Sequence, residues 1–396
     1  MPRNGEVLIA GACRTSIGKF LGGLSSFKAP QLGALVIRET LRRAGVAADQ
    51  IDEVIMGQVV QGGSGQAPAR QAAIHGGIPA TVGAMTVNKV CGSGLKAAML
   101  AAQAIRAGDA SVIVAGGMES MSQAPFLLPD ARTGMRLGGT QIQDSVIVDG
   151  LWDSFNNFHM GNAAELIARK FKVSREDQDR YAFDSHRKAV ASIDACRFST
   201  EIVPVEVVQK KGEPRKITTD ESPRRDTSLE VLAKLKPAFE SGGTVTAGNA
   251  PGLNDGAAAM VVLSEARAKE LGVKAEARVV EYATGGAEPE MVFYAPVIAV
   301  RKLMQKMGVK IDHWDLIESN EAFAAQALVD GRELGWDWDR VNVNGGAIAL
   351  GHPIGASGAR ILATLIQALK ARGKSTGLAT LCLGGGNAVA MAIERV

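Results

Sequence analysis

The sequence predicts an α/β protein with mainly parallel or mixed sheets, built as two similar halves around an inserted segment. Short β-rich runs alternate with stretches that follow the 3.6-residue period of a helix. One pattern, a small-residue turn followed by a helix, a strand and two glycines, occurs twice. The 46 glycines cluster between apolar runs, which indicates tight turns and close backbone approach.

The expected elements follow from these runs. Strands are expected at residues 6–10, 54–59, 84–87, 111–115, 315–318, 377–383 and 388–393. Helical periodicity covers 32–41 and 95–105, and Gly45 and Gly108 stand where helices commonly stop. Ser174, with an acidic residue three positions later, is typical of a capped helix N-terminus, so a helix is expected to continue to about residue 195.

The repeat sets the expected organisation. In its first copy, residues 93–94 open a helix that leads to a strand and then to glycines 116–117. In its second copy, residues 357–358 open a helix that leads to a strand and then to glycines 384–385. The region between the copies is richer in proline, arginine and polar residues. We therefore expect an N-terminal half at 1–120 to which 248–270 return, an inserted subdomain at 121–247, and a C-terminal half at 271–396.

Composition excludes several functional classes. The net charge of +3 gives no case for general nucleic-acid or membrane-surface binding. No apolar run approaches the roughly 18 residues of a membrane helix, and no signal-peptide layout is present, so we expect a cytoplasmic protein. The four cysteines form no Cys-x-x-Cys pair, which predicts free thiols and no metal site.

The first candidate site is the segment 88–95. A strand-like run leads into it and an amphipathic helix follows, so Cys91 is expected at a helix N-terminus. Backbone N–H groups and the helix dipole there would stabilise a thiolate and hold a developing oxyanion. A lone cysteine is more commonly a buried structural residue, but the neighbouring glycines suit close approach by a ligand.

Three further residues are candidates. His352 lies in a glycine-rich loop before a helix, where it can serve as a general base or simply face solvent. Cys382 ends a strand and can exchange a proton or pack in the core. Asn320 enters a helix after a strand, where it can donate a hydrogen bond to a ligand or cap the helix.

Together these motifs closely resemble the thiolases, the acetyl-CoA C-acetyltransferases. The similar segments are 88–95, 320–324, 351–358 and 382–386, with 12–18, 116–122, 159–161 and 246–257 in addition. The resemblance runs from about residue 6 to residue 393, and four spaced motifs in the right order are far more specific than one glycine pattern. It implies the layered αβαβα fold of the thiolases.

The resemblance also implies catalytic roles. Cys91 would be the acylated nucleophile and His352 would take its proton. Cys382 would remove a proton from the α-carbon of a second acyl thioester, or return it during thiolysis. Asn320, through a water, and His352 would form one oxyanion hole, and the backbone N–H groups of Cys91 and Gly384 would form a second.

Coenzyme A would bind through the inserted region. The resemblance places Leu151, His159, Met160, Arg224, Phe239, Ala247, Ala322 and Phe323 along its channel. Arg224 would meet the nucleotide's phosphate and adenine, although a surface arginine pair is the simpler interpretation. Acyl-CoA thioesters and coenzyme A would be the substrates and products, with no other cofactor, and the chain would form a homo-oligomer, a dimer or a tetramer.

The sequence departs from the family at three places. Pro251 replaces a common serine and cannot supply a hydroxyl, which puts one pantetheine contact in doubt. Val231 stands where a serine is also common. Residues 292–296 replace a Met-Gly-x-Gly-Pro motif near the acyl pocket, which adds bulk and can change the acyl-chain preference.

Alternatives remain within reach of the same motifs. A β-ketoacyl synthase-like condensing enzyme would also use a cysteine, but it usually has a second histidine where Asn320 stands and lacks Cys382. A non-catalytic thiolase-like protein for acyl thioesters or lipids would have lost a catalytic side chain. A phosphate loop at 11–19 is rejected, because its spacing is wrong and Phe20 follows the lysine.

The resemblance to the thiolases therefore implies condensation of two acetyl-CoA to acetoacetyl-CoA, and the reverse reaction.

Overall fold

The computed structural model describes residues 5–209 and 212–396. Its centre is one mixed β-sheet. Among these residues eleven strands join the sheet, and its main path is β15-β16-β17-β14-β1-β13-β5-β3-β4. The strands are β1 (Val7–Thr15), β2 (Gly18–Lys19), β3 (Glu53–Gly57), β4 (Gly83–Val87), β5 (Val112–Ser120), β10 (Ile202–Val203), β13 (Asn254–Ser264), β14 (Ala277–Gly286), β15 (Leu316–Ser319), β16 (Thr376–Leu383) and β17 (Asn387–Arg395).

The two halves of the sheet have the same order of corresponding strands, counted from the centre of the sheet to each edge. The first half reads β1-β13-β5-β3 and the second reads β14-β17-β16-β15, with β1 and β14 paired antiparallel. The halves share a hydrogen-bonding detail at the start of β5 and of β16. The Asp52 carboxylate accepts the N–H of Val112 at 2.9 Å, and the Asp315 carboxylate accepts the N–H of Thr376 at 3.0 Å. The predicted internal repeat is confirmed.

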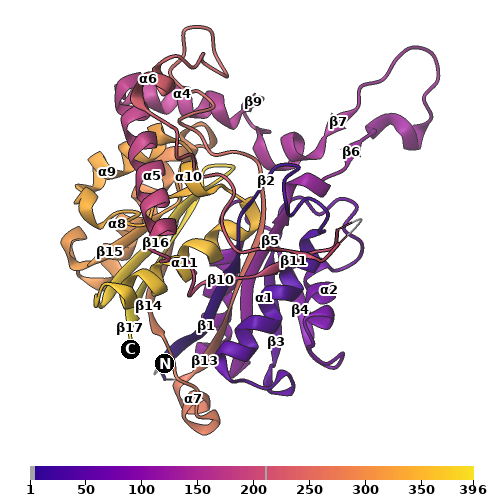
Figure 1. The fold of residues 1–396 in the computed structure, drawn as a ribbon, viewed down its shortest axis with the longest axis vertical. Coiled ribbons are helices and arrows are strands. Elements are labelled where there is room, and N and C mark those ends of the chain that lie inside the picture. The colour runs from indigo at the N-terminus through magenta and orange to yellow at the C-terminus, as the bar shows by residue number, and fades with distance from the viewer. Residues whose placement is uncertain (1–4, 210–211) are drawn as a thin grey trace.

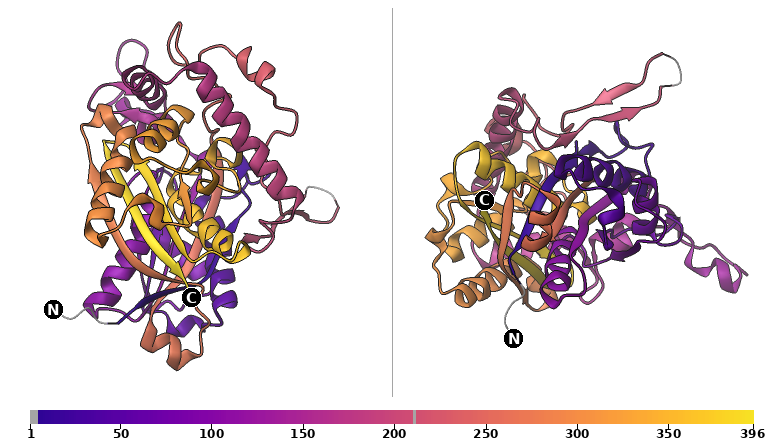
Figure 2. Two further views of the ribbon diagram at one scale, coloured as in Figure 1. Left: turned by 90° about the vertical axis from the view of Figure 1, so that its left-hand side faces the viewer. Right: turned by 90° about the horizontal axis from the view of Figure 1, so that it is seen from below.

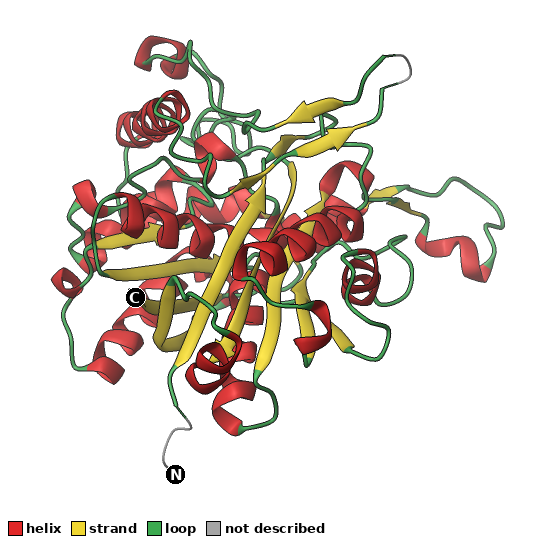
Figure 3. Ribbon diagram, turned by 60° about the horizontal axis from the view of Figure 1, so that its bottom comes forward, coloured by secondary structure: helices red, strands yellow, loops and turns green. Residues whose placement is uncertain are grey.

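Helices separate and cover the two halves of the sheet (Figure 1 and Figure 3). They are α1 (Ala29–Ala44), α2 (Pro68–His75), α3 (Ser93–Ala107), α7 (Glu265–Leu271), α8 (Ala295–Met307), α9 (Ala324–Leu334), α10 (Ala347–Leu350) and α11 (Ile354–Ala371). α3 and α11 contact each other and strands of both halves, whereas α1 and α2 pack on the first half and α8 packs on the second. α11 is buried on every side from Ile354 to Leu369, as a helix in a middle layer must be. The result is the expected αβαβα layering.

Each expected strand is present, but several expected boundaries are wrong. β1 continues five residues past its expected end at residue 10, and β3 ends at Gly57 instead of residue 59. β5 does not stop before glycines 116–117 and continues to its end three residues later. The reason is close packing: a Cβ atom on Gly117 would overlap the carbonyl oxygen of Gly355, so this strand needs glycine where α11 rests on it. α11 itself begins about one turn before Ser357, the predicted start.

The inserted segment covers one end of the sheet (Figure 1). It contains α4 (Met160–Lys170), α5 (Arg175–Asp194), α6 (Leu229–Ala233), and the short strands β6 (Phe126–Leu127), β7 (Gln143–Asp144), β8 (Trp152–Asp153), β9 (Phe158–His159), β11 (Val205–Val207) and β12 (Arg215–Ile217). The Ser174 hydroxyl caps α5, as expected. Buried Arg14 of β1 fastens the segment through Glu201 at 2.6 Å and Asp220 at 2.7 Å. Figure 2 shows the arm around β6 and β7 projecting from the body.

The cysteines are unpaired. Cys13 and Cys382 are buried, Cys91 is partly exposed and Cys196 is exposed. None of the helices in the described ranges 5–209 and 212–396 has the length and apolar character needed to cross a membrane.

Candidate active site

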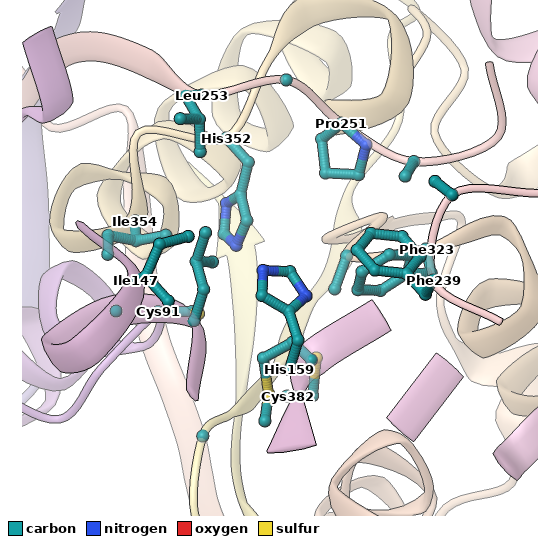
Figure 4. Close-up of a pocket in the computed structure, with 18 of the residues that line it drawn as sticks. Cys91, Ile147, His159, Phe239, Pro251, Leu253, Phe323, His352, Ile354 and Cys382 are labelled. Carbon is teal, nitrogen blue, oxygen red and sulfur yellow. The ribbon is translucent and has the colours of Figure 1, made fainter. Parts of the chain in front are cut away.

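A cavity of about 360 Å³ brings together residues from both halves and from the inserted segment. Cys91 comes from the first half, His352 and Cys382 come from the second, and His159 comes from the insertion. Figure 4 shows these four side chains around one space. The other predicted site residues in its wall are Leu151, Met160, Phe239, Ala247, Ala322, Phe323 and Gly384.

Cys91 lies on a strained turn between β4 and α3. The preceding residue, Val90, has φ +46°, a left-handed conformation that a β-branched residue rarely adopts. Side chains hold the turn in place. The Asn88 side-chain oxygen accepts the Val90 N–H at 2.9 Å, and the Ser93 hydroxyl donates to the Val90 carbonyl at 2.6 Å while accepting the Lys89 N–H at 2.8 Å. Strain that is held this firmly is typical of functional sites.

The Cys91 thiol is neutral at rest. Burial raises its pKa to about 12, although the backbone N–H groups of Cys91 and Gly384 act in the opposite direction. The sequence predicted that the helix N-terminus would lower the Cys91 pKa and stabilise a thiolate, but the net shift of this pKa is upward. α3 begins at Ser93, so Cys91 precedes the helix, and burial outweighs the favourable N–H groups. The same N–H groups remain available to an acyl oxygen.

His352 is oriented as a hydrogen-bond acceptor toward Asn320. Its Nδ1 lies 2.7 Å from the Ser357 hydroxyl, which donates its own proton to the Pro353 carbonyl at 2.9 Å. A serine hydroxyl has only one proton, so His352 Nδ1 must carry the hydrogen and Nε2 must carry the free lone pair. Burial, assisted by Arg360, lowers the His352 pKa to about 3, which keeps the resting imidazole neutral.

Asn320 lies directly beside this imidazole. Its Nδ2 is 3.5 Å from His352 Nε2, longer than a strong hydrogen bond. Asn320 Oδ1 is buried and has no hydrogen-bond partner among the residues that the structure describes. α9 begins at Ala324 with Phe323 as its N-cap, so Asn320 does not cap the helix. An uncommitted buried amide next to a histidine is suited to bind a water or a substrate oxygen.

Cys382 reaches the cavity from the end of β16. Burial raises its pKa well above the ordinary value, and the charge of a Cys91 thiolate raises it further. The two thiols are therefore close enough to influence each other's ionisation, and both are protonated at rest.

Aromatic side chains of the inserted segment and Phe323, the N-cap of α9, form another part of the cavity wall. The His159 ring stacks on Phe239, with the centroids 4.9 Å apart, and Phe239 meets Phe323 edge to face. His159 Nδ1 accepts the Gly161 N–H at 3.0 Å and caps α4, so its Nε2 carries the hydrogen and can donate to a ligand.

Comparison with known proteins identifies the family. The family model of the thiolase N-terminal domain matches residues 7–266, and that of the thiolase C-terminal domain matches residues 273–395.

The chain belongs to the thiolase family.

Its relatives include an acetyl-CoA acetyltransferase of Pseudomonas aeruginosa, 57% identical over 98% of this chain and 99% of the relative. An acetyl-CoA acetyltransferase of Cupriavidus necator is 54% identical over 98% and 99%. The crystal structure of the Bacillus anthracis acetyl-CoA acetyltransferase superposes with a TM-score of 0.97 at 42% identity, and the match covers 100% of both chains.

The departures of this thiolase from the family pattern fall at different places around the site. Pro251 lines the cavity, as do Val292 and Phe293 of the replaced 292–296 segment. Phe293 packs edge to face with Phe323, with the centroids 5.3 Å apart, so its added bulk lies in the wall. Val231 is exposed, 48% of its surface, on α6.

Arg224 is the one predicted channel residue that lies outside the cavity wall. Its side chain is exposed, and its backbone N–H donates to His186 Nδ1 at 3.1 Å. Its neighbour Arg225 pairs with Asp194 at 2.5 Å. The cavity itself therefore gives Arg224 no contact with an acyl group, and any role for it concerns a part of the ligand outside the cavity.

Much of the cavity wall of this thiolase consists of small and apolar residues for which the sequence predicted no role. These residues are Met121, Ile147, Gly150, Ala238, Thr246, Ala250, Gly252, Leu253 and Ile354. Several lie within the segments 116–122, 246–257 and 351–358 that resemble the thiolases, but nothing in their own pattern marks them, because an apolar residue in a cavity wall has the same pattern as one in the core. Ser357 was also missed as the partner of His352, although it lies in the same glycine-rich motif.

Proposed function

We propose that this thiolase transfers acyl groups between coenzyme A thioesters, converting two acetyl-CoA into acetoacetyl-CoA and coenzyme A, and the reverse, through an acyl-Cys91 intermediate. The observation that carries the proposal is the meeting of Cys91, His352 and Cys382 in one cavity. The names of the relatives, at 52–57% identity over nearly the full chain, support the same reaction.

The first half-reaction acylates Cys91. His352 Nε2 takes the thiol proton as the Cys91 sulfur attacks the thioester carbonyl, which avoids a costly free thiolate in a buried site. The tetrahedral intermediate collapses and the carbon–sulfur bond to coenzyme A breaks. Cys382 gives its proton to the departing sulfur, which leaves acyl-Cys91, an imidazolium at His352 and a thiolate at Cys382.

The second half-reaction forms the carbon–carbon bond. The Cys382 thiolate removes a proton from the α-carbon of a second acetyl-CoA, and the carbanion attacks the acyl carbonyl on Cys91. As the Cys91 sulfur departs it takes the proton back from His352. All three groups return to their resting protonation states, so the cycle closes without a proton from solvent.

Two sets of donors serve the oxygens that become charged. The backbone N–H groups of Cys91 and Gly384, which already lower the pKa of the thiol, are suited to the acyl oxygen on Cys91. Asn320, through a water, and protonated His352 are suited to the enolate oxygen of the second thioester. Because every step uses a side chain or a backbone group, we propose that no cofactor besides the coenzyme A thioesters takes part.

We propose that coenzyme A extends past the His159 and Phe239 pair, with Leu151, Met160 and Ala247 beside it. A hydrogen-bond donor at His159 Nε2 within an apolar wall suits the amides and chain of pantetheine. Arg224, outside the cavity, is proposed to contact the nucleotide end of the ligand. We place the reaction in the cytoplasm, where both thiols stay reduced.

We propose that the chain forms a homo-oligomer. The arm around β6 and β7 projects from the body of the molecule (Figure 1). Its side chains Phe126, Met135, Leu137 and Ile142 are exposed. Strand β4 ends the sheet and exposes Met85. An apolar arm and an open sheet edge both favour contact with a second copy. Light scattering should give a dimer or tetramer, and a monomer at micromolar concentration would contradict the proposal.

A condensing synthase is not favoured. This chain has Asn320 where such enzymes usually have a second histidine, and it has Cys382, which they lack. A non-catalytic binding protein is not favoured either, since Cys91, His352 and Cys382 line one cavity and Asn320 lies beside His352.

Cys382→Ser separates the two half-reactions. The variant should still transfer acetyl from acetyl-CoA to Cys91, but more slowly, because serine leaves the nucleophile and His352 in place but is a poorer proton donor to the departing sulfur. It should form acetoacetyl-CoA far more slowly still, because an alcohol cannot supply the thiolate that removes the α-carbon proton. Acetyl incorporation and acetoacetyl-CoA formation would be measured on the same sample. Condensation at the wild-type rate in this variant would refute the role of Cys382.

A further inference from the structure

Glu119, near the end of β5, is a fully buried carboxyl group that the proposed reaction does not use. Its Oε2 accepts the N–H of Val59 at 3.0 Å and the N–H of Gly355 at 3.0 Å, and its Oε1 accepts the N–H of Val60 at 3.3 Å. One carboxyl group thus binds the backbone of two segments that lie almost 300 residues apart in the sequence.

The first of these segments supports the Cys91 turn. Val59 and Val60 follow β3, and the Val59 carbonyl accepts a hydrogen bond from the Asn88 side-chain amide at 3.4 Å. The other atom of that side chain, Asn88 Oδ1, holds the N–H of Val90, the strained residue next to Cys91. A displacement of the Val59 backbone therefore reaches the nucleophile through one side chain.

The second segment carries the base. Gly355 lies three residues after His352, in the first turn of α11, and the same turn contains Ser357, which orients the imidazole. The free N–H groups of a helix N-terminus need hydrogen-bond acceptors, and the Glu119 carboxyl oxygen supplies one to Gly355. A displacement of this turn moves His352 relative to Cys91.

The two segments pack closely at this point, where Ile354 also shares an apolar cluster with Val59 and Val60. A Cβ atom on Gly355 would lie 2.8 Å from the Cα of Gln58 and 2.8 Å from the carbonyl oxygen of Met118, so α11 rests directly on backbone. The Glu119 carboxyl group fills the adjoining space and supplies the polar link. Burial raises the Glu119 pKa to about 8, although its three N–H donors act in the opposite direction. Burying a carboxyl group therefore costs free energy, whereas an apolar side chain could fill the same space without that cost.

We propose that Glu119 is a positioning residue that fixes the Cys91 turn against the His352 loop, so that the thiol and the imidazole meet in the geometry of acyl transfer. The inference rests on the proposed function for its kinetic consequence, and on the backbone hydrogen bonds alone for its structural consequence. Glu119 does not touch the reacting atoms, and its effect on the reaction passes through Val59, Val60 and Gly355.

Glu119→Gln tests the proposal, because glutamine keeps the shape but replaces one acceptor by a donor that faces backbone N–H groups. We expect kcat for thiolysis and the rate of Cys91 acetylation to fall about 10- to 100-fold, the usual effect of a small misplacement, while KM stays within about twofold. Asp315→Asn is the matched control. Its carboxylate also accepts two backbone N–H groups, of Ser375 and Thr376, but at the start of β16 instead of its catalytic end.

Hydrogen–deuterium exchange gives a readout that does not depend on activity. In Glu119→Gln, exchange should accelerate both at residues 57–62 and at residues 352–357, whereas Asp315→Asn should leave both segments unchanged. If the glutamine variant folds poorly, Glu119→Asp, which keeps the carboxyl group but is one methylene too short to reach both segments, should show the same pattern.

Three results would overturn the proposal: a wild-type kcat in the Glu119 variants, an equal loss of kcat in Asp315→Asn, or faster exchange in only one of the two segments. If the wild-type protein itself neither acetylates Cys91 nor cleaves acetoacetyl-CoA, the proposed function fails. The exchange experiment then still decides whether Glu119 joins the two segments.

Discussion

The hydrogen bond from His352 to Ser357 gives a sharp test of how the base is prepared. Ser357→Ala removes the acceptor that lies 2.7 Å from His352 Nδ1 and leaves a buried N–H without a partner. An unsatisfied buried donor costs about 1–3 kcal/mol. The cost should be greatest in the transition state, where His352 holds a second proton and both ring nitrogens must donate.

If the whole penalty falls on the transition state, kcat should drop by about 5- to 150-fold, since each 1.36 kcal/mol is a factor of about ten. Thiolysis of acetoacetyl-CoA at saturating substrate would measure the drop. Ser192→Ala, a similarly buried serine of α5 whose hydroxyl lies 3.4 Å from Asn344 Oδ1, is the control and should keep its kcat. A folded Ser357→Ala variant with kcat within about twofold of the wild type would show that Ser357 does not orient the base.

Two further predictions concern the cavity wall and the resting thiol. Phe293→Ala should enlarge the acyl end of the cavity. The ratio of kcat/KM for longer 3-ketoacyl-CoAs to kcat/KM for acetoacetyl-CoA should then rise about tenfold, as expected when an apolar pocket is opened. An unchanged ratio would show that another part of the protein limits chain length. Because burial raises the Cys91 pKa to about 12 and lowers the His352 pKa to about 3, both groups are neutral at pH 7. The rate of Cys91 alkylation by iodoacetamide should therefore climb about tenfold per pH unit above neutrality, and a plateau near neutral pH would instead indicate a resting thiolate–imidazolium pair.

Local sequence signals were sufficient for most of the strands and helices and for the internal repeat, whereas the αβαβα layering was predicted from the resemblance to the thiolases. Alternating runs placed the strands, and the repeated turn, helix and strand gave the two halves. The failures came where contacts between distant segments decide the structure. The glycines at 116–117 looked like the end of a strand, but Gly117 is required because α11 rests on it. α11 starts a turn early, at Ile354 directly after Pro353, and the run of small residues there gave no clear signal for the boundary.

For the site, too, local sequence signals identified some residues, while contacts formed only by folding identified others. Motifs brought Cys91, His352 and Cys382 to attention because their local sequences are unusual. The sequence also indicated the helix N-terminus near Cys91, which would lower the pKa of the thiol. It did not indicate the burial of Cys91, which raises this pKa instead. Ser357 and Glu119 act through hydrogen bonds that exist only after folding, and Glu119 binds a segment more than 200 residues away. No pattern within one stretch of sequence can reveal such a contact.

Mixing the protein with acetyl-CoA alone, followed by acid quench and peptide mass analysis, tests the central claim most directly. The account predicts one acetyl group per active site, carried on Cys91, removed by added coenzyme A and lost in Cys91→Ala. An acetyl group on another residue, or condensation that proceeds in Cys91→Ala, would contradict it.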